Sequence, residues 1–217
     1  MSEPGSAPSG SPPLLRVRGL TRRFGEIAVV HDLDLDVAAG HGLALVGRNG
    51  AGKSTVLRCI VGADRPTSGS VELNGVRIDE RSERIRRDLA VAMDDMDFFP
   101  DLSVVEHLDL LARAHGVEDA EAVVDAVLAE VGLVPQSDQL PPTLSSGQRR
   151  RLALASAFVR PRRLLVLDEP EQRLDAAGRA WLAERLRAEK ADGLGVLLAS
   201  HDEQLVAAVA DATLSLA

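Results

Sequence analysis

The chain has 217 residues, of which 45% are hydrophobic and 27% charged, a composition typical of a soluble globular protein. Its formal net charge of −8 argues against non-specific nucleic-acid binding through the whole surface, and its 2% aromatic content argues against stacking platforms for single strands. No apolar run reaches membrane-spanning length and the start does not resemble a signal peptide, so we expect a cytoplasmic protein whose membrane role comes through a partner.

The beginning of the chain predicts a tail followed by two strands. Residues 1–13 are rich in Ser, Pro and Gly without apolar periodicity, which predicts a disordered tail. Residues 14–20 and 27–37 alternate apolar and polar side chains, as half-exposed antiparallel strands do. Phe24 lies between them, either as a core aromatic or as a side chain that stacks on a ligand.

A glycine-rich segment at residues 47–54, with the sequence GRNGAGKS, follows a predicted buried strand at 42–46 and precedes a predicted helix. Its glycines allow successive backbone N–H groups to point inward, and the helix N-terminus adds the positive end of its dipole. The pattern predicts a phosphate-binding P-loop, in which Lys53 reaches the β- and γ-phosphates and Ser54 places its hydroxyl on Mg²⁺. Lys53 and Lys190 are the only lysines in the sequence, and this cradle requires a compact point charge.

The helix after the P-loop carries the single cysteine, and further strands and helices follow it. Cys59 excludes an internal disulfide, and its apolar neighbours predict a buried, inert thiol. Residues 71–78 contain an Asn-Gly pair, the strongest short-range signal of a β-hairpin, and residues 89–93 form an apolar strand pattern. Two helices then follow, one with its N-cap at Ser103 and one at about 118–131.

A second anion-binding signal is the segment Leu-Ser-Ser-Gly-Gln at residues 144–148, which opens another predicted helix. Ser145 can cap this helix while its first N–H groups stay free. Three arginines follow at 149–151, and a solvated face explains them at least as well as a phosphate contact does.

The apolar residues 164–167 run directly into Asp168 and Glu169, which predicts a buried parallel strand with two carboxylates at the end where α/β sheets place ligands. Adjacent strand residues point to opposite sides, so one carboxylate is free to hold Mg²⁺ while the other faces the γ-phosphate and an attacking water. An amphipathic helix at 176–190 leads to a strand that ends on His201. The alternation continues with a helix at 203–210 and a closing strand at 213–216, and this pattern predicts a parallel sheet.

Taken together, the ordered motifs resemble those of the ATP-binding-cassette (ABC) ATPases, the nucleotide-binding subunits of ABC transporters. The resemblance covers residues 14–217 as one nucleotide-binding domain. The matching motifs are the Walker A loop at 47–54, the signature at 144–148, the Walker B strand at 164–168 with Glu169, the D-loop-like Leu174–Asp175 and the switch His201. The fold class that we expect is α/β, a P-loop NTPase with a mostly parallel core sheet, a flanking antiparallel β subdomain and an α-helical insert at about 95–160.

The resemblance also implies how the site works. In the ATP-bound state two copies would form a head-to-tail homodimer, in which Ser145 and Gly147 of one subunit complete the γ-phosphate site formed by the P-loop of the other. Glu169 would act as the general base or polarise the attacking water, with Lys53 and His201 at the γ-phosphate, and Asp168 would hold Mg²⁺. The residues expected to bind nucleotide are Phe24, Gly47, Arg48, Asn49, Gly50, Ala51, Gly52, Lys53, Ser54, Thr55, Ser145, Gly147, Gln148 and Asp175, and those expected at Mg²⁺ are Ser54, Asp168 and Asp94.

Two positions depart from the family's usual pattern. Asp94 stands where the family usually has a glutamine that binds Mg²⁺ and senses the transmembrane partner. Aspartate is shorter and charged, so we expect altered metal affinity or slower turnover. Ser146 stands where glycine is commoner in the signature, and its small size should be tolerated. Nearby, Phe98 and Phe99 either pack a coupling helix of the membrane partner or belong to the core.

The leading function is therefore the ATPase subunit of an ABC transporter, bound to a separately encoded membrane-spanning partner at the inner face of the cell membrane. The short chain looks most like the small export-type ATPases. The alternative is a soluble ABC ATPase with an assembly or scaffold role, and a third possibility is a nucleotide-binding regulator that has lost catalysis. No nucleic-acid partner is expected.

Overall fold

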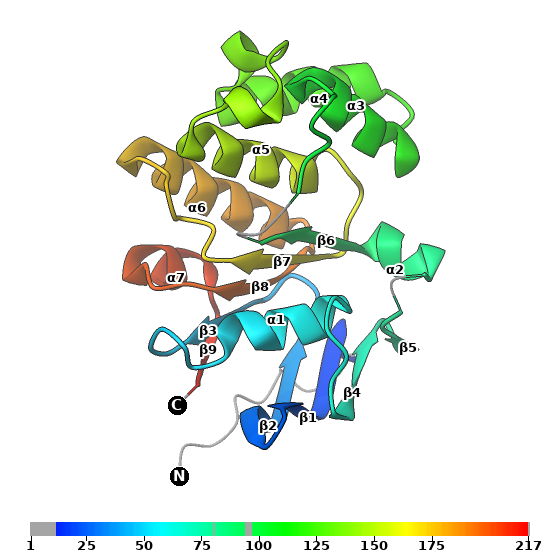
Figure 1. Cartoon of the computed structure of the whole chain (residues 1–217), viewed down its shortest axis with the longest axis vertical. Helices are drawn as coiled ribbons and strands as arrows, with labels where there is room; N and C mark the ends of the chain where they lie inside the picture. The colour runs from blue at the N-terminus through cyan, green and yellow to red at the C-terminus, as the bar shows by residue number, and fades with distance from the viewer. Residues whose placement is uncertain (1–11, 80, 94–96, 217) are drawn as a thin grey trace.

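Two β-sheets organise the computed structural model, which describes residues 12–79, 81–93 and 97–216 (Figure 1). The first sheet is parallel, with the strand order β6, β7, β8, β3 and β9. These strands are Leu89–Ala92, Leu164–Asp168, Gly195–Ala199, Gly42–Val46 and Ala212–Ser215. The second sheet is antiparallel, with the order β2 (Ile27–Val37), β1 (Leu15–Phe24), β4 (Ser68–Leu73) and β5 (Val76–Arg77).

The helices fall on the two faces of the parallel sheet. On one face, α1 (Lys53–Val61) packs between the parallel sheet and the antiparallel sheet. On the other face lie α3 (Val104–Ala114), α4 (Ala120–Val131), α5 (Ser146–Phe158), α6 (Ala176–Ala191) and α7 (Glu203–Val209). The short helix α2 (Glu83–Asp88) precedes β6, and two 3₁₀ turns, Val134–Gln136 and Pro141–Thr143, precede α5.

Alternate side chains of the parallel sheet pack into two separate hydrophobic cores. In β7, Leu164 and Val166 join the core on the α1 face, whereas Leu165 and Leu167 join the core under α3 to α7. Successive side chains of a strand point to opposite faces, so a continuous apolar strand is one that is covered on both sides. With both faces covered, the strand ends are the places where this sheet can present polar chemistry.

The sequence-based expectations for these elements are largely confirmed. The structure contains the two N-terminal antiparallel strands, the hairpin at Asn74–Gly75, the strand before Asp168 and the strand before His201. Cys59 is buried, as expected, and burial raises the pKa of its thiol. Helix α2 was not predicted, because its polar, basic sequence buries only Ile85 and Asp88.

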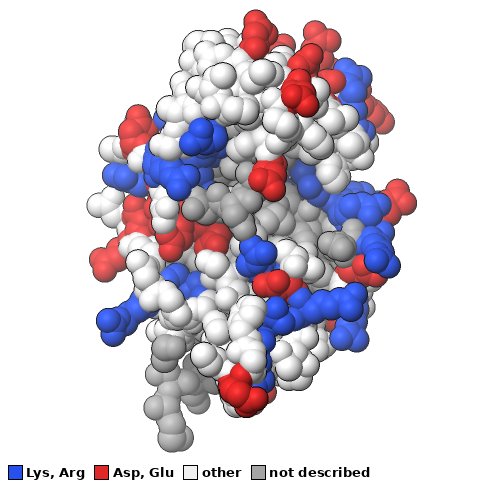
Figure 2. Space-filling model, viewed as in Figure 1, with Lys and Arg blue, Asp and Glu red and all other residues white. Residues whose placement is uncertain are grey.

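Charge is distributed unevenly over the surface. On the face shown in Figure 2, acidic side chains gather over the helices at the top of the view, and arginines gather at the right, near α2. The exposed arginines of α2 include Arg84, Arg86 and Arg87. Within the described part of the chain, no helix is both long enough and apolar enough to span a membrane.

Candidate functional site

Three loops meet at the carboxyl edge of the parallel sheet because their strands end in register. Leu45 of β3 pairs with Ala199 of β8, and Ala199 pairs with Asp168 of β7. The backbone N–H of Glu169 then donates to the carbonyl of Ala199 at 2.8 Å. The P-loop, the residues after Asp168 and the segment at His201 therefore leave the sheet side by side, at the edge where α/β sheets place their ligands.

The P-loop has the conformation that a phosphate cradle requires. Gly52 is the N-cap of α1 with a left-handed φ of 91°, and among the described residues no side-chain hydrogen bond caps this helix. The first N–H groups of α1 are thus not used by a side-chain cap and are available to an anion. A Cβ on Gly47 would lie 2.4 Å from the carbonyl oxygen of Leu216, so the close approach of the C-terminal strand requires glycine there.

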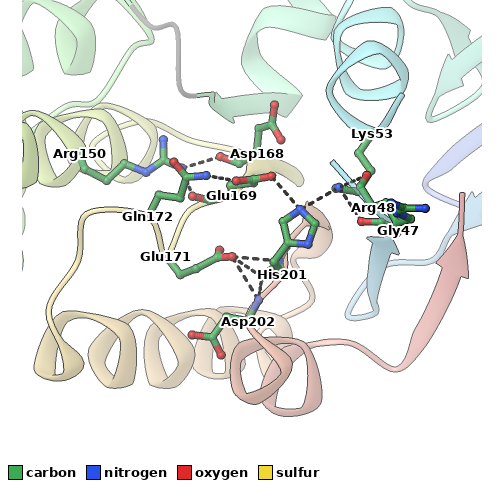
Figure 3. Close-up of polar contacts among 11 residues, drawn as sticks. Gly47, Arg48, Lys53, Arg150, Asp168, Glu169, Glu171, Gln172, His201 and Asp202 are labelled. Atoms are coloured by element: carbon green, nitrogen blue, oxygen red, sulfur yellow. Dashed lines mark hydrogen bonds and ion pairs between the residues drawn. The ribbon is translucent and has the colours of Figure 1, made fainter. Parts of the chain in front are cut away.

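Lys53 is 5% exposed, and its ammonium group is held inside the loop. Its Nζ donates to the carbonyl oxygens of Gly47 at 2.9 Å and Arg48 at 3.2 Å, and it lies 3.0 Å from Nε2 of His201 (Figure 3). These contacts use the three donors of the ammonium group. Phosphate oxygens carry charge and accept more strongly than neutral carbonyls, so a bound triphosphate would compete well for Lys53.

His201 lies between Lys53 and Glu169. The ammonium of Lys53 can only donate, so Nε2 of His201 accepts this hydrogen bond as a neutral imidazole. The same Nε2 is 3.3 Å from Oε1 of Glu169, and that contact becomes a hydrogen bond only when Nε2 carries a proton. A cation, an imidazole and a carboxylate thus follow one another along the edge of the sheet (Figure 3).

Asp168 and Glu169 occupy different surroundings. Asp168 ends β7 and is 5% exposed, whereas Glu169 has left the strand with a φ of 45°. Figure 3 shows the Glu169 carboxylate directed toward His201 and the Asp168 carboxylate directed away from it. The predicted separation is present, but its cause is the break in the strand and not the alternation within a strand.

Two neighbours of these acids were not anticipated from the sequence. The side-chain amide of Gln172 donates to Oε2 of Glu169. Arg150 is 3% exposed, and its guanidinium donates to the carbonyls of Asp168 at 2.5 Å, Glu169 at 2.6 Å, Pro170 at 3.3 Å and Met93 at 3.3 Å. The expectation of a solvated face is wrong for Arg150, because it is the buried member of the arginine run.

The signature segment is built as a helix start. Ser145 is the N-cap of α5 and accepts from the backbone N–H of Gln148, whose side chain accepts from the backbone N–H of Ser145, so the two form a capping box. A Cβ on Gly147 would lie 3.0 Å from the carbonyl of Arg173. Since α5 packs on the face of the sheet opposite α1, the structure does not bring the signature and the P-loop of one chain together.

The remaining predicted residues are placed as follows. Phe24 ends β1 and is 49% exposed, with the Arg22 guanidinium 4.3 Å from its ring centroid, so the alternative of a core aromatic is wrong. Asp175 caps α6 and forms an ion pair with Arg151 at 3.0 Å. Arg48, Asn49, Gly50 and Ser54 are exposed on the P-loop side, and Ala51 and Thr55 are half-buried. Asp94 lies outside the described residues.

Phe98 and Phe99, which precede α3, were predicted either to contact a membrane partner or to belong to the core, and the structure places them differently. Phe98 packs against the hydrophobic core, and Phe99 is 49% exposed. Both rings contact the ring of His107, with centroid distances of 5.4 and 5.5 Å. Phe98 therefore has the core role, and Phe99 leaves half of its ring at the surface.

The oxygen groups present suit Mg²⁺ bound together with a nucleotide. Among the described residues, no group of three or more His, Cys, Asp or Glu side chains is arranged to hold a metal ion. Mg²⁺ usually takes one or two carboxylates and completes its shell with phosphate oxygens and water. The Asp168 carboxylate and the Ser54 hydroxyl are hard oxygen ligands of that kind. An open groove of about 800 Å³ has Arg48, Glu169 and His201 in its lining.

Comparison with known proteins gives a consistent assignment. A family model described as "ABC transporter" matches residues 30–172. The aliphatic sulfonates import ATP-binding protein of Rhodopseudomonas palustris is 37% identical over 202 residues, which cover 92% of this chain and 69% of that protein. The Nod factor export ATP-binding protein I of Cupriavidus pinatubonensis is 37% identical, over 87% of this chain and 58% of its own length. The chain thus spans between about half and two thirds of such curated relatives.

Solved structures show the same fold. An ATP-binding subunit of an ABC transporter superposes with a TM-score of 0.87 at 31% identity, covering 94% of this chain and 85% of the other. A dimeric ATP-binding cassette in a post-hydrolysis state with ADP and phosphate superposes with a TM-score of 0.83 at 21% identity, over 93% of this chain and 94% of the other.

Proposed function

The chain belongs to the ABC transporter family as an ATP-binding ATPase, and we propose that ATP closes two copies of it head to tail and so powers a separately encoded membrane-spanning partner. The observation that carries the proposal is the line of Lys53, His201 and Glu169 at the carboxyl edge of the parallel sheet. Phosphoryl transfer needs positioning and charge stabilisation more than covalent chemistry, and these three groups supply both.

Each group has one role in the proposed reaction. The N–H groups of the P-loop and the ammonium of Lys53 hold the β- and γ-phosphates. Glu169 orients the attacking water and accepts its proton, and His201 donates a hydrogen bond to the γ-phosphate. Mg²⁺, with Ser54 and Asp168 as protein ligands, would neutralise charge on the phosphate oxygens. Phe24 would stack on adenine with its exposed ring.

The separation of the two anion-binding segments supports the proposed homodimer. Ser145 and Gly147 lie on the face of the sheet opposite α1, so a second copy is needed to place them on the γ-phosphate. The dimeric cassette with ADP and phosphate, a structure of the same fold, is consistent with this arrangement. Binding to a membrane partner would then place the chain at the inner face of the membrane.

Replacement of Glu169 by glutamine tests whether the site is catalytic. Glutamine keeps the shape but cannot accept the proton, so we expect steady-state ATP turnover to fall about 100-fold or more. The matched control is Glu184→Gln, on an exposed side chain of α6 that forms an ion pair with Arg187. Equal turnover of the wild type and the Glu169 variant would instead favour a regulator without catalysis.

The partner is tested by purification of the tagged chain from detergent-solubilised membranes of its native host. Stoichiometric recovery of a protein with several membrane spans, identified by mass spectrometry, is the expected outcome. Recovery from the soluble fraction alone would support the assembly or scaffold role. The relatives include both import and export subunits, so the sequence-based preference for export is not part of this proposal.

A further inference from the structure

A buried carboxylate outside the proposed catalytic set holds the backbone next to His201. Glu171 is 8% exposed, and its Oε1 accepts three hydrogen bonds (Figure 3). The donors are the hydroxyl of Ser200 at 2.7 Å, the backbone N–H of His201 at 3.1 Å and the backbone N–H of Asp202 at 3.3 Å. All three belong to the short segment between β8 and α7.

Hydrogen bonds from the segment between β8 and α7 compensate for the burial of the Glu171 carboxylate. A buried carboxylate is tolerated when hydrogen-bond donors replace its lost water, and the donors here converge on one oxygen. The other oxygen, Oε2, is buried without a hydrogen bond among the described residues. The Ser200 hydroxyl, 2% exposed, also accepts from the backbone N–H of Asp202 at 3.0 Å, so the same segment is held at two points.

The imidazole of His201 needs this support because its own contacts are not permanent. In the structure its Nε2 contacts only Lys53 and Glu169 among the described residues. In the proposed reaction Lys53 turns to the phosphates and Glu169 to the attacking water, so both contacts change when ATP binds. The hydrogen bond that Glu171 accepts from the backbone N–H of His201 holds residue 201 itself and does not depend on either group.

The position of Glu171 along the chain also links the backbone near His201 to the loop that carries Glu169, the proposed general base. Glu171 is two residues after Glu169, and Pro170 between them is buried and restricts the backbone. The loop that carries Glu169 therefore also fixes the backbone of the loop that carries His201. A shift of one loop can thus reach the other through this side chain, in addition to the backbone hydrogen bond from Glu169 to Ala199.

We propose that Glu171 is a positioning residue that keeps the His201 imidazole aimed at the γ-phosphate throughout the ATPase cycle. This inference rests on the proposed role of His201. What Glu171 supplies is an acceptor oxygen of fixed position, and its negative charge is secondary. A glutamine at this position retains the acceptor, whereas a leucine of similar volume does not.

The test compares Glu171→Gln, Glu171→Leu and Ser200→Ala in the full chain, with Glu184→Leu as a control for an exposed glutamate. For Glu171→Leu we expect kcat to fall at least tenfold while KM for ATP changes less than threefold, because nucleotide binding uses the P-loop. Glu171→Gln should retain kcat within about threefold, and Ser200→Ala should lie between the two. Loss of kcat in Glu171→Gln equal to that in Glu171→Leu would overturn the proposal, as would wild-type kcat in Glu171→Leu.

Hydrogen exchange gives a second readout that does not depend on activity. The backbone amides of His201 and Asp202 should exchange faster in Glu171→Leu and at nearly the wild-type rate in Glu171→Gln. Unchanged exchange in both variants would show that Glu171 does not hold this segment. If Glu171→Leu does not fold, as judged by circular dichroism, the comparison of Glu171→Gln with Ser200→Ala decides, since wild-type exchange in Ser200→Ala would contradict the proposed contacts.

A double-variant experiment separates this inference from the proposed role of His201. If Glu171 acts through His201, Glu171→Leu should lower the residual turnover of His201→Ala by less than twofold. A further loss as large as in the wild-type background would overturn the inference. Wild-type turnover of His201→Ala would refute the role of His201 itself, and faster exchange in Glu171→Leu would still identify the contact.

Discussion

At the scale of single residues, the Arg150 side chain connects α5 to the backbone at the end of β7. Its guanidinium lies against the carbonyls that follow β7, on either side of the left-handed Glu169. A non-glycine residue with positive φ is disfavoured unless its surroundings hold it. We infer that the hydrogen bonds from Arg150 are part of what holds Glu169 in this conformation.

Replacement of Arg150 by methionine should therefore weaken both stability and catalysis. Methionine fills similar space but leaves several buried carbonyls without this donor, so we expect the free energy of unfolding to fall by about 2–4 kcal/mol. ATP turnover should fall more than stability alone explains, measured at a temperature where the variant is folded. The control is Arg149→Met, since Arg149 is exposed and donates to Leu144; it should change stability by less than about 0.5 kcal/mol. Equal effects of both variants would contradict the special role of Arg150.

Some residues of the candidate site could be predicted from the sequence, and others could not. The P-loop, the acids after β7 and His201 were predicted because each belongs to a short motif at a strand end, where chemistry follows from local pattern. Arg150 and Glu171 were not, since their partners lie far away along the chain. The separation is 18 to 20 residues, and 57 for Met93, in the case of Arg150, and 29 to 31 residues in the case of Glu171. A run of three arginines does not reveal which one is buried, because the phase of the helix relative to its neighbours is set by tertiary packing.

At the scale of elements, the best-predicted parts are those with strong periodicity or explicit caps. The strands of the parallel sheet were predicted from continuous apolar runs, and α3 from its capping box at Ser103 and Glu106. The basic helix α2 was missed because six residues are too few to show a helical period. The order of the strands was not available from the sequence, since β3 lies between β8 and β9 through pairings of distant segments.

Helix α3 carries a titratable group in its packed face, which predicts that the stability of the fold depends on pH. His107 is 3% exposed between the rings of Phe98 and Phe99, and its Nε2 lies 3.2 Å from the hydroxyl of Ser156. Burial lowers the pKa of His107 below its usual 6.5, so folding favours the neutral ring. Its contribution is complete above about pH 6.5 and is lost as the pH falls from there toward the lowered pKa.

We therefore expect the Tm of the wild type to fall between pH 7.5 and pH 5.5 by more than the Tm of His107→Gln. Glutamine cannot take up a proton but still offers hydrogen-bonding groups to Ser156. The measurement is differential scanning calorimetry at matched ionic strength, with His31→Gln as an exposed control that should follow the wild type. Parallel pH curves for wild type and His107→Gln would show that this histidine is not the source of the dependence.

At the scale of the whole molecule, the separation of the two anion-binding segments supports the proposed head-to-tail homodimer. The P-loop lies with α1 on one face of the parallel sheet and the signature opens α5 on the other, with the sheet between them. Each chain also carries a net charge of −8, so two copies repel one another over about a Debye length of 10 Å at 0.1 M salt. In the proposed dimer, closure would therefore need a ligand that binds both subunits, and a triphosphate with Mg²⁺ between the P-loop of one copy and the signature of the other would be such a ligand.

A mixing experiment tests this head-to-tail arrangement. A chain with Lys53→Ala has a defective P-loop, and a chain with Ser145→Arg has a signature that blocks the γ-phosphate, so neither variant alone should dimerise with MgATP or turn it over. In a mixture, the P-loop of the Ser145 variant can meet the intact signature of the Lys53 variant, and one complete site forms in each mixed dimer. We expect light scattering to detect an ATP-dependent dimer only in the mixture, together with ATP turnover above the sum of the two variants. If the site were complete within one chain, mixing would restore neither property, because each chain would retain its own defect.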